Sequence, residues 1–296
     1  MRTVMSEFLT THEVADLLRI KVRKVYDLAS RGKIPCSRAT GKLLFPKDAV
    51  HRWLANNGTT PPAADEQQSL PNVLLGSHDP LLEWALRASG CGIATFFDGS
   101  LDGVMRFLDG AGMASAMHIY NRKSGEWNIP CVRDKLHHRN VALMEWAKRD
   151  RGIILSEACT RSVTHIADVA GLTLVPRQPG AGSQQLFEQL LDDAGIGESD
   201  CAFVTPERTE SDAVLPLLEH KADASFGLPS VAEQYKLRFV PVIQERVDIA
   251  VDRKAWFEPA WQHFLRFCGS DTFANKTATT EGYDFRSFGT IHYNAD

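Results

Sequence analysis

Three turns, each expected to join a strand to a helix, carry residue types that bind small polar ligands. They are Gly76-Ser77-His78-Asp79-Pro80, Gly99-Ser100 and Gly180-Ala181-Gly182-Ser183. Each places a glycine and a hydroxyl where a helix begins, and a helix N-terminus exposes unpaired N–H groups and a partial positive charge. One such turn is usually an ordinary helix cap. Three in matching positions predict that Ser77, Ser100 and Ser183 line one crevice for an anion or polar ligand.

Three further side chains are expected beside this crevice. Arg177 precedes the third turn, and its guanidinium could pair with a carboxylate or oxyanion or clamp backbone carbonyls. His118 follows an apolar strand and could donate to a ligand or be a hydrogen-bonded core residue. Ser211 adds another hydroxyl. Together with the three turn serines, these residues form the predicted ligand-binding site.

A second group of residues with recognisable chemistry is basic and lies near the N-terminus. Residues 1–57 contain eleven Lys/Arg and five Asp/Glu, a net charge of +6, whereas the remainder has a net charge of −10. Proteins that bind polyanions concentrate positive charge in this way, although a solvated basic face has the same composition. The candidate DNA-binding side chains are Lys21, Arg23, Lys24, Arg38 and Lys42.

Local patterns predict the elements that hold this basic group. Thr10 and Glu13 form a capping-box pattern that begins a short helix ending near Leu18. After a tight connection at residues 19–21, a second apolar stripe indicates a helix that stops before Gly32. Residues 37–45 are expected to form a hairpin, or wing, before a third helix that starts at residues 46–48. The first two helices have helix-turn-helix spacing.

The segment from Phe8 to Leu54 resembles the excisionase and MerR-like winged helix-turn-helix family. The resemblance rests on Tyr26 in the second helix, on the Gly-Lys-Ile-Pro run at residues 32–35, and on Asp-x-x-x-x-Trp-Leu at residues 48–54. It implies that double-stranded DNA is a partner. Arg23 and Lys24 would face the DNA groove, and Arg38 and Lys42 would belong to the wing.

Lys21 departs from this family, in which the recognition helix usually begins with a Ser or Thr cap. A positive side chain at a helix N-terminus opposes the helix dipole, so we assign Lys21 to a phosphate contact.

The rest of the chain predicts a second, larger domain. Residues 58–72 are mostly polar and contain prolines without helical or strand periodicity, which is typical of a linker. From residue 73, apolar strand-like runs alternate with helical patterns, which implies βαβ units and a largely parallel sheet. We therefore expect a DNA-binding domain at 1–57, a linker at 58–72 and an α/β effector domain at 73–296.

The larger domain resembles the type 2 periplasmic-binding-protein-like domain found behind excisionase-type modules and on some molybdopterin-biosynthesis proteins. The motifs that carry this resemblance lie at residues 76–80, 116–120, 124–128, 175–183, 221–227, 239–242 and 245–246. The resemblance implies two lobes joined by crossing strands, near residues 141–160 and 240–252, with ligand between the lobes. Gln184-Gln185 replaces the family's usual Thr or Ser followed by Arg, and Pro176 replaces a common Asn, so we expect an altered pocket.

Enzyme, metal and membrane motifs are missing from the sequence. It has no GxxxxGK[ST], HExxH or GxSxG pattern, and its six cysteines form no CxxC pair, as expected for reduced thiols. No apolar run approaches the ~20 residues that span a bilayer. We therefore predict no catalytic residue, metal ligand or cofactor, and a cytoplasmic location.

The sequence thus predicts an α/β protein with a small winged helix-turn-helix and a two-lobed effector domain. We expect a one-component transcription regulator that is a homodimer or higher oligomer. Its effector is predicted to be a small oxyanion, with molybdate or tungstate ahead of sulfate-like or carboxylate ligands, because the expected crevice is rich in serine hydroxyls and glycine-flanked amides and has few obvious fixed cations. The alternatives are an enzyme or cofactor-handling protein of molybdopterin metabolism, and an architectural DNA protein whose second domain oligomerises.

Overall fold

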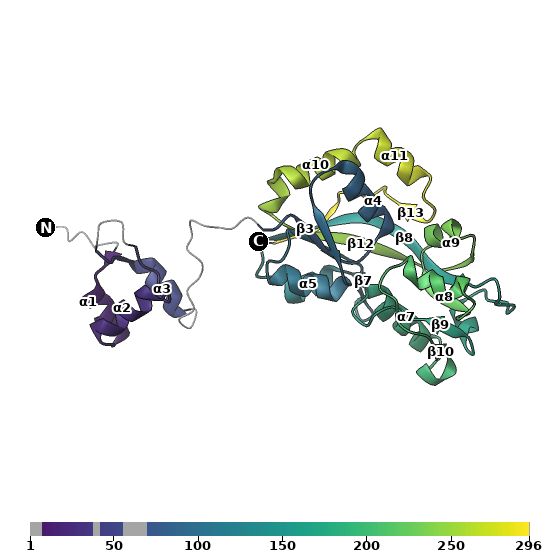
Figure 1. The fold of residues 1–296 in the computed structure, drawn as a ribbon, viewed down its shortest axis with the longest axis horizontal. Coiled ribbons are helices and arrows are strands. Elements are labelled where there is room, and N and C mark those ends of the chain that lie inside the picture. The colour runs from purple at the N-terminus through teal and green to yellow at the C-terminus, as the bar shows by residue number, and fades with distance from the viewer. Residues whose placement is uncertain (1–7, 38–41, 56–69, 296) are drawn as a thin grey trace. The chain divides into compact units, whose positions relative to one another are not determined.

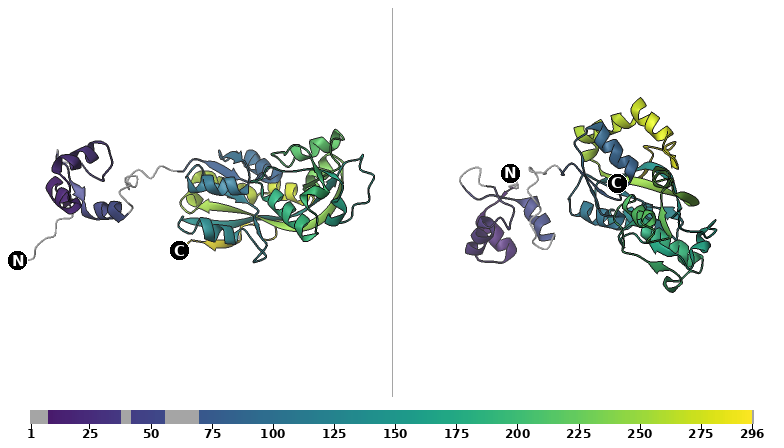
Figure 2. Two further views of the ribbon diagram at one scale, coloured as in Figure 1. Left: turned by 90° about the horizontal axis from the view of Figure 1, so that it is seen from below. Right: turned by 45° about the vertical axis from the view of Figure 1, so that its right-hand side comes forward.

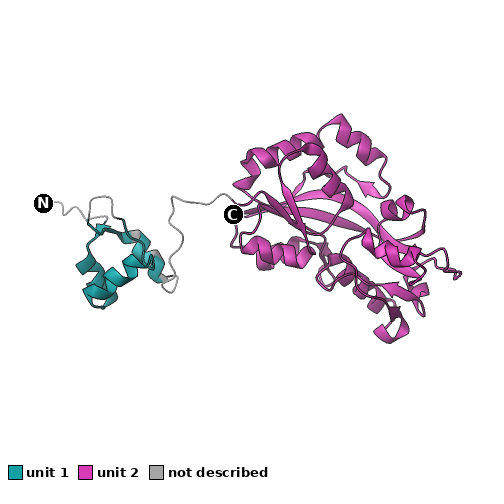
Figure 3. Cartoon of the chain, viewed as in Figure 1, with its two compact units in different colours: residues 1–69 teal, residues 70–296 magenta. Residues whose placement is uncertain are grey.

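The computed structural model describes residues 8–37, 42–55 and 70–295. The chain divides into two compact units, Met1–Ser69 and Leu70–Asp296, which are coloured separately in Figure 3. Each unit has its own buried core. In the described part of the chain, no helix is both long enough and apolar enough to span a membrane.

The first unit contains three helices and a small sheet. Its elements are β1 (Phe8–Leu9), α1 (Thr11–Leu18), α2 (Val22–Ser30), β2 (Phe45–Pro46) and α3 (Lys47–Ala55). The predicted capping box is present, with the Glu13 amide donating to Thr10 Oγ1 at 3.3 Å and the Thr10 amide donating to Glu13 Oε2 at 2.7 Å. The core of the unit consists of Val14, Ala15, Val25, Ala29, Ile34, Phe45, Val50 and Trp53.

The base of the predicted hairpin is also present. Ser37 and Leu44 form an antiparallel bridge, and β1 pairs antiparallel with β2 to extend this small sheet. The predicted turn at Thr40-Gly41 and the wing residue Arg38 lie outside the described residues.

The second unit is built on one mixed sheet with the order β10-β9-β11-β8-β12-β5-β3-β4. Two long neighbouring strands, β8 (Val141–Leu155) and β12 (Arg238–Asp252), run antiparallel through its middle. They are the crossing strands expected near residues 141–160 and 240–252. The flanking strands are β3 (Val73–Gly76), β4 (Ala94–Phe97), β5 (Ala114–Met117), β9 (Thr173–Val175), β10 (Ala202–Phe203) and β11 (Ala224–Gly227).

Each end of the long strands belongs to a different lobe. Strands β3, β4 and β5 run parallel in lobe 1, and β9, β10 and β11 run parallel in lobe 2. Lobe 1 comprises residues 70–140 and 253–295, and lobe 2 comprises residues 156–237. Figures 1 and 2 show the long strands passing from one group of helices to the other. The predicted α/β fold with two lobes is confirmed.

Helices cover both faces of the sheet in each lobe. In lobe 1, α4, α10 and α11 lie on one face and α5 and α6 on the other, with separate apolar clusters beneath them (Figure 1). Lobe 2 likewise has one cluster under α7 and another under α8 and α9. The helix bounds are α4 (Pro80–Ser89), α5 (Ser100–Leu108), α6 (Ile129–Lys135), α7 (Gly182–Asp193), α8 (Leu215–Leu218), α9 (Pro229–Gln234), α10 (Pro259–Cys268) and α11 (Asp271–Ala278).

The remaining elements are short. A hairpin of β6 (Tyr120–Asn121) and β7 (Glu126–Trp127) extends from lobe 1, and β13 (Tyr283–Asp284) and β14 (Ile291–Asn294) pair with β8. Single 3₁₀ turns occur at Ile166–Val169, Glu198–Asp200, Asp212–Val214 and Ala255–Phe257. The C-terminal segment therefore returns to lobe 1 and pairs with one of the crossing strands.

Candidate functional site

The three glycine- and serine-containing turns begin helices from opposite lobes. Asp79 caps α4, because the Leu82 amide donates to its Oδ1 at 2.6 Å. Helix α5 begins at Ser100 after Gly99, whose φ of 112° is difficult for any residue with a Cβ. Helix α7 of lobe 2 begins at Gly182. The predicted placement of these turns at helix N-termini is confirmed.

The lobes touch where these helices begin. A Cβ added at Gly99 would lie 2.6 Å from the carbonyl oxygen of Gly180, and one added at Gly182 would lie 2.5 Å from the carbonyl oxygen of His118. Across the same boundary, Gln178 Nε2 donates to the carbonyl of Asp98 at 2.7 Å. The structure therefore shows the lobes in contact, with the N-termini of α5 and α7 close together.

Four of the predicted ligand-binding residues lie around this contact. Ser77 Oγ and Ser100 Oγ are 3.1 Å apart, and the His118 amide donates to Ser100 Oγ at 3.3 Å. Ser183 follows the glycine that packs on Ser100, and its Oγ is buried without a hydrogen-bond partner among the described residues. Ser211 is half-buried and lies next to Glu210 in the chain, outside these contacts.

A buried ionic network begins beside His118 and is centred on Glu245. The two oxygens of Glu245 accept from Arg149 Nε, from Arg151 Nε at 2.9 Å and from His118 Nδ1 at 2.8 Å. All four side chains are at most 2% exposed. Because Arg149 and Arg151 come from β8 and Glu245 from β12, this hub joins the two crossing strands to the end of β5.

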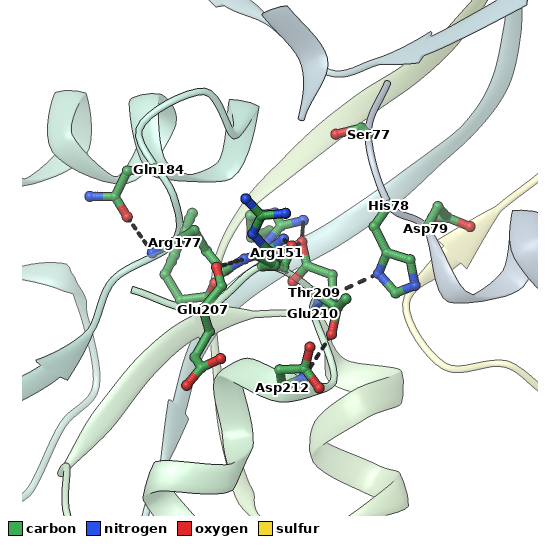
Figure 4. Close-up of polar contacts among 12 residues, drawn as sticks. Ser77, His78, Asp79, Arg151, Arg177, Gln184, Glu207, Thr209, Glu210 and Asp212 are labelled. Carbon is green, nitrogen blue, oxygen red and sulfur yellow. Dashed lines mark hydrogen bonds and ion pairs between the residues drawn. The ribbon is translucent and has the colours of Figure 1, made fainter. Parts of the chain in front are cut away.

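The network extends from the hub into both lobes. On the lobe 1 side, Arg149 also donates to Asp79, which accepts from the Tyr283 hydroxyl at 2.8 Å. On the lobe 2 side, Arg151 Nη2 lies 2.9 Å from Glu210. Figure 4 shows Ser77, His78 and Asp79 on the opposite side of Arg151 from Arg177 and Gln184.

Arg177 is held by groups of its own lobe. Its Nη1 lies 2.8 Å from Glu210 Oε1, and it donates to the carbonyls of Glu207 at 3.1 Å and Arg208 at 2.6 Å. Its backbone amide donates to Gln184 Oε1 at 2.7 Å. Gln184, one of the two family departures in α7, therefore positions the strand end that carries Arg177. The sequence left two roles open for Arg177, pairing with a ligand anion or clamping backbone carbonyls. The structure shows Arg177 clamping carbonyls and also pairing with Glu210.

One expectation behind the oxyanion prediction is wrong. The sequence indicated few fixed cations near the crevice, yet Arg149 and Arg151 are buried there beside Arg177. In the sequence, both arginines lie in the charged segment 148–151, between the two apolar parts of β8. This segment could not be interpreted, because their partners Glu210 and Glu245 lie 59 and 94 residues away from Arg151 along the chain.

The network shifts the pKa values of Glu245, Glu210 and His118. Burial disfavours the charged form of Glu245, but Arg149 and Arg151 outweigh it and hold the pKa of this carboxyl well below its usual range. Glu210 behaves in the same way, with its pKa lowered mainly by Arg151 and Arg177 against burial. For His118, burial outweighs the nearby Glu245 and lowers its pKa. Three arginines are thus balanced by three carboxylates, namely Asp79, Glu210 and Glu245.

An open surface hollow lies at a different place, near the crossing strands. It is lined by Asp150, Gln244, Thr277, Ala278, Gly282, Tyr283, Asp284, Phe285 and Arg286. Tyr283 connects this hollow to the network, since its hydroxyl donates to Asp79. The hollow contains none of the six predicted ligand-binding residues.

Family models match both parts of the chain. Residues 83–269 match a PBP superfamily domain, and residues 8–58 match a helix-turn-helix domain. A curated relative, the "Uncharacterized protein YvgK" of Bacillus subtilis (strain 168), is 22% identical over 299 residues, which cover 95% of this chain and 96% of the relative.

Solved structures share the fold of the second unit. A putative phosphate ABC transporter substrate-binding protein from Clostridium perfringens, solved with bound phosphate, has a TM-score of 0.52 at 11% identity, covering 74% of this chain and 98% of that protein. The regulatory domain of MetR, a LysR family regulator from N. meningitidis, has a TM-score of 0.50 at 10% identity, covering 72% and 96%. Both transport and regulatory proteins therefore share this fold.

The contact at Gly182 predicts a substitution that separates the lobes. In Gly182→Ala, the new methyl would strike the His118 carbonyl and Ser100 Oγ, whereas α7 itself tolerates alanine. We expect amide hydrogen exchange in residues 98–103 and 116–120 to rise about tenfold as the lobes open. Gly180→Ala is the matched control, since a Cβ there meets nothing within 4 Å. Equal exchange in the two variants would contradict the contact.

Proposed function

This chain belongs to the PBP superfamily, and we propose that it is a DNA-binding transcription regulator whose PBP-like domain binds a small polar ligand between its lobes. The observation that carries the proposal is the meeting of helix N-termini from opposite lobes beside buried serines, in a chain that also has a helix-turn-helix. Helix N-termini with free N–H groups are natural binding sites for anionic and polar ligands. We place the protein in the cytoplasm, where it can reach DNA.

The DNA-binding surface is proposed to lie at the start of α2. Lys21 precedes this helix without a side-chain cap, and Arg23 and Lys24 lie in its exposed first turn. Lys24 Nζ is 3.5 Å from Asp27, a weak surface contact that phosphate could replace. Lys42 is exposed beside the small sheet, and Arg38 remains assigned to the wing from the sequence alone. Lysine and arginine at these positions would supply phosphate contacts and base readout.

Ligand binding is proposed to act on DNA through lobe closure. A ligand that contacts both lobes binds the closed form better than the open form, and it shifts the population by that difference in affinity. In a homodimer, closure would change the spacing of two DNA-binding units and hence the fit to paired half-sites. The dimer is part of the proposal because one small reader contacts few bases.

The charge balance of the crevice bears on the class of ligand. With three arginines paired to three carboxylates, a fully charged oxyanion would have to take an arginine from Glu210 or Glu245 and leave that carboxylate buried and unpaired. The buried donors that have no hydrogen-bond partner among the described residues include Arg149 Nη2 and Ser183 Oγ. These donors favour a small ligand with few acceptor groups and little net charge. Oxyanions, including molybdate and tungstate, remain the competing class of ligand.

A thermal-shift screen of the full chain tests this function. Molybdate, tungstate, sulfate and phosphate form one arm, and amino acids, small carboxylates and neutral polyols form the other. A ligand at about 100 times its Kd should stabilise the protein by roughly 2.7 kcal/mol. Ser183→Ala should weaken that ligand by roughly 1–3 kcal/mol if the hydroxyl donates to it. Saturable binding that is unaffected by Ser183→Ala and by Gly182→Ala would place the ligand outside the crevice.

A further inference from the structure

A second polar cluster is buried in lobe 1, away from the network centred on Glu245. Glu145 and Asp248 face each other as paired residues of β8 and β12, and His292 joins them from β14. One ligand atom from each of these three residues lies within 4.8 Å of the other two. Glu145 and Asp248 are at most 1% exposed, and the His292 side chain is 22% exposed. The cluster is thus closed on the protein side and accessible through the histidine.

Each carboxylate in this cluster has one oxygen held and one oxygen without a partner. Asp248 Oδ2 accepts from Asn128 Nδ2 at 2.8 Å and from Arg246 Nε at 3.0 Å, and Glu145 Oε2 is 2.6 Å from His292 Nε2. Asp248 Oδ1 and Glu145 Oε1 are buried and have no hydrogen-bond partner among the described residues. A buried carboxylate oxygen left unsatisfied is costly, so two in one cluster indicate a missing positively charged partner.

The charges around the cluster are also incomplete. Among the described residues, Arg246 is the cation that contacts the cluster, through Asp248, while His292 contacts Glu145. The two carboxylates thus share one full positive charge, from Arg246, and a divalent cation would supply the missing positive charge.

We propose that Glu145, Asp248 and His292 form a binding site for a divalent first-row transition-metal ion such as Zn²⁺ or Mn²⁺. Carboxylate and imidazole together suit these ions, whereas Mg²⁺ prefers an all-oxygen, octahedral set. Metal–ligand bonds of about 2.0–2.2 Å place neighbouring ligand atoms roughly 3.0–3.5 Å apart. The ligand atoms lie within 4.8 Å of one another, so they would have to move closer by up to roughly 1–2 Å around the ion.

The ion would bind Glu145 Oε1, Asp248 Oδ1 and His292 Nε2, with water completing its coordination. His292 would exchange its hydrogen bond with Glu145 for the metal bond and bind as the neutral tautomer, its proton moving from Nε2 to Nδ1 by exchange with solvent. Asn128 and Arg246 already orient the carboxylate of Asp248, as groups around metal sites commonly do. The bound ion would fasten the C-terminal strand β14 to both crossing strands, giving the site a structural role independent of the proposed ligand crevice.

The test measures binding of Zn²⁺, Mn²⁺ and Mg²⁺ to the full chain by titration calorimetry after treatment with EDTA. The exposed neighbours His137 and His138 could capture Zn²⁺ adventitiously, so the background protein carries His137→Ala and His138→Ala. We expect one Zn²⁺ or Mn²⁺ per chain and no Mg²⁺. His292→Ala in this background should weaken binding at least about 100-fold, and His263→Ala, at an exposed site on α10, should not.

A second measurement distinguishes loss of the metal site from loss of folding in a variant. Bound Co²⁺ in the background protein should give visible absorption bands that saturate at one equivalent and disappear when Zn²⁺ is added. Asp248→Asn should abolish the bands while circular dichroism of the protein is retained. Absence of both Zn²⁺ and Mn²⁺ binding, binding that survives His292→Ala, or Co²⁺ spectra unchanged by Asp248→Asn would each overturn the proposal.

Discussion

Replacing Glu245 with glutamine is expected to lower the free energy of unfolding by about 3–5 kcal/mol. Glu245 accepts from Arg149, Arg151 and His118, and all of them are buried. The amide removes one negative charge and leaves three buried arginines, including Arg177, with two carboxylates, Asp79 and Glu210. Urea denaturation of the full chain, followed by tryptophan fluorescence, measures this loss, because the buried Trp146 lies in the same strand as Arg149.

The same substitution changes the dependence of stability on pH. The pKa of Glu245 is lower in the folded state than in the unfolded chain, where it is about 4.3, so its contribution is fully present above that value. That contribution decreases as pH falls through the unfolded pKa towards the lowered folded pKa. Wild-type protein should therefore lose stability more steeply below about pH 5 than Glu245→Gln does.

Two controls separate the network from general effects of losing a carboxylate. Glu126→Gln changes an exposed strand residue and should leave stability within about 0.5 kcal/mol of wild type. Adding Arg149→Met to Glu245→Gln removes one cation with one anion, so the double variant should be more stable than the sum of the two single losses implies. Additive losses would show that the ion pair is not the source of the effect.

Reversing Arg23 and Lys24 to glutamate is expected to reduce DNA affinity of the full chain by about 100-fold or more at low salt. Both side chains lie in the exposed first turn of α2. In helix-turn-helix proteins, the N-terminal residues of the second helix contact bases in the major groove. Removing two contacts should also reduce the slope of log affinity against log salt concentration by about 2. Fluorescence anisotropy with labelled duplex DNA between 50 and 200 mM salt, roughly the range in which such contacts dominate, measures both effects.

The control for this pair lies at the other end of the same helix. Arg31→Glu and Lys33→Glu change the net charge equally, but these residues follow the C-terminus of α2. We expect them to lower affinity far less than the pair at the N-terminal turn. Equal losses in the two double variants would mean that net charge alone governs DNA binding and would remove Arg23 and Lys24 from a specific interface.

Local signals in the sequence were sufficient for much of the fold. The capping box of Thr10 and Glu13, the three-residue turn before α2 and the glycines at the starts of α5 and α7 all act over a few residues, so their patterns can be read directly. The crossing strands β8 and β12 were expected from family resemblance, since a pairing of strands about 100 residues apart leaves no periodic signal. Strand β1 was missed, because two residues are too short to show alternation.

The chemistry of the site was harder to predict for the same reason. Glu245 pairs with Arg149, 96 residues away, and Glu145 pairs with His292, 147 residues away, so no spacing motif records either contact. The sequence therefore predicted serines at helix starts but neither the buried network nor the cluster of Glu145, Asp248 and His292. Burial also decides the role of His118, whose ring binds Glu245 in the core; its position at a strand end fitted a ligand contact equally well.

The most direct test of the regulator is whether a ligand of the PBP-like domain changes the DNA affinity of the same chain. Duplexes selected from a random pool by the full chain supply the DNA, and the strongest stabiliser in the thermal-shift screen supplies the ligand. We expect the ligand to change the Kd for that DNA by at least fivefold, in either direction, which corresponds to a coupling free energy of roughly 1 kcal/mol or more. The change should be lost in Gly182→Ala and kept in Gly180→Ala. Equal DNA affinity with and without saturating ligand would contradict this expectation.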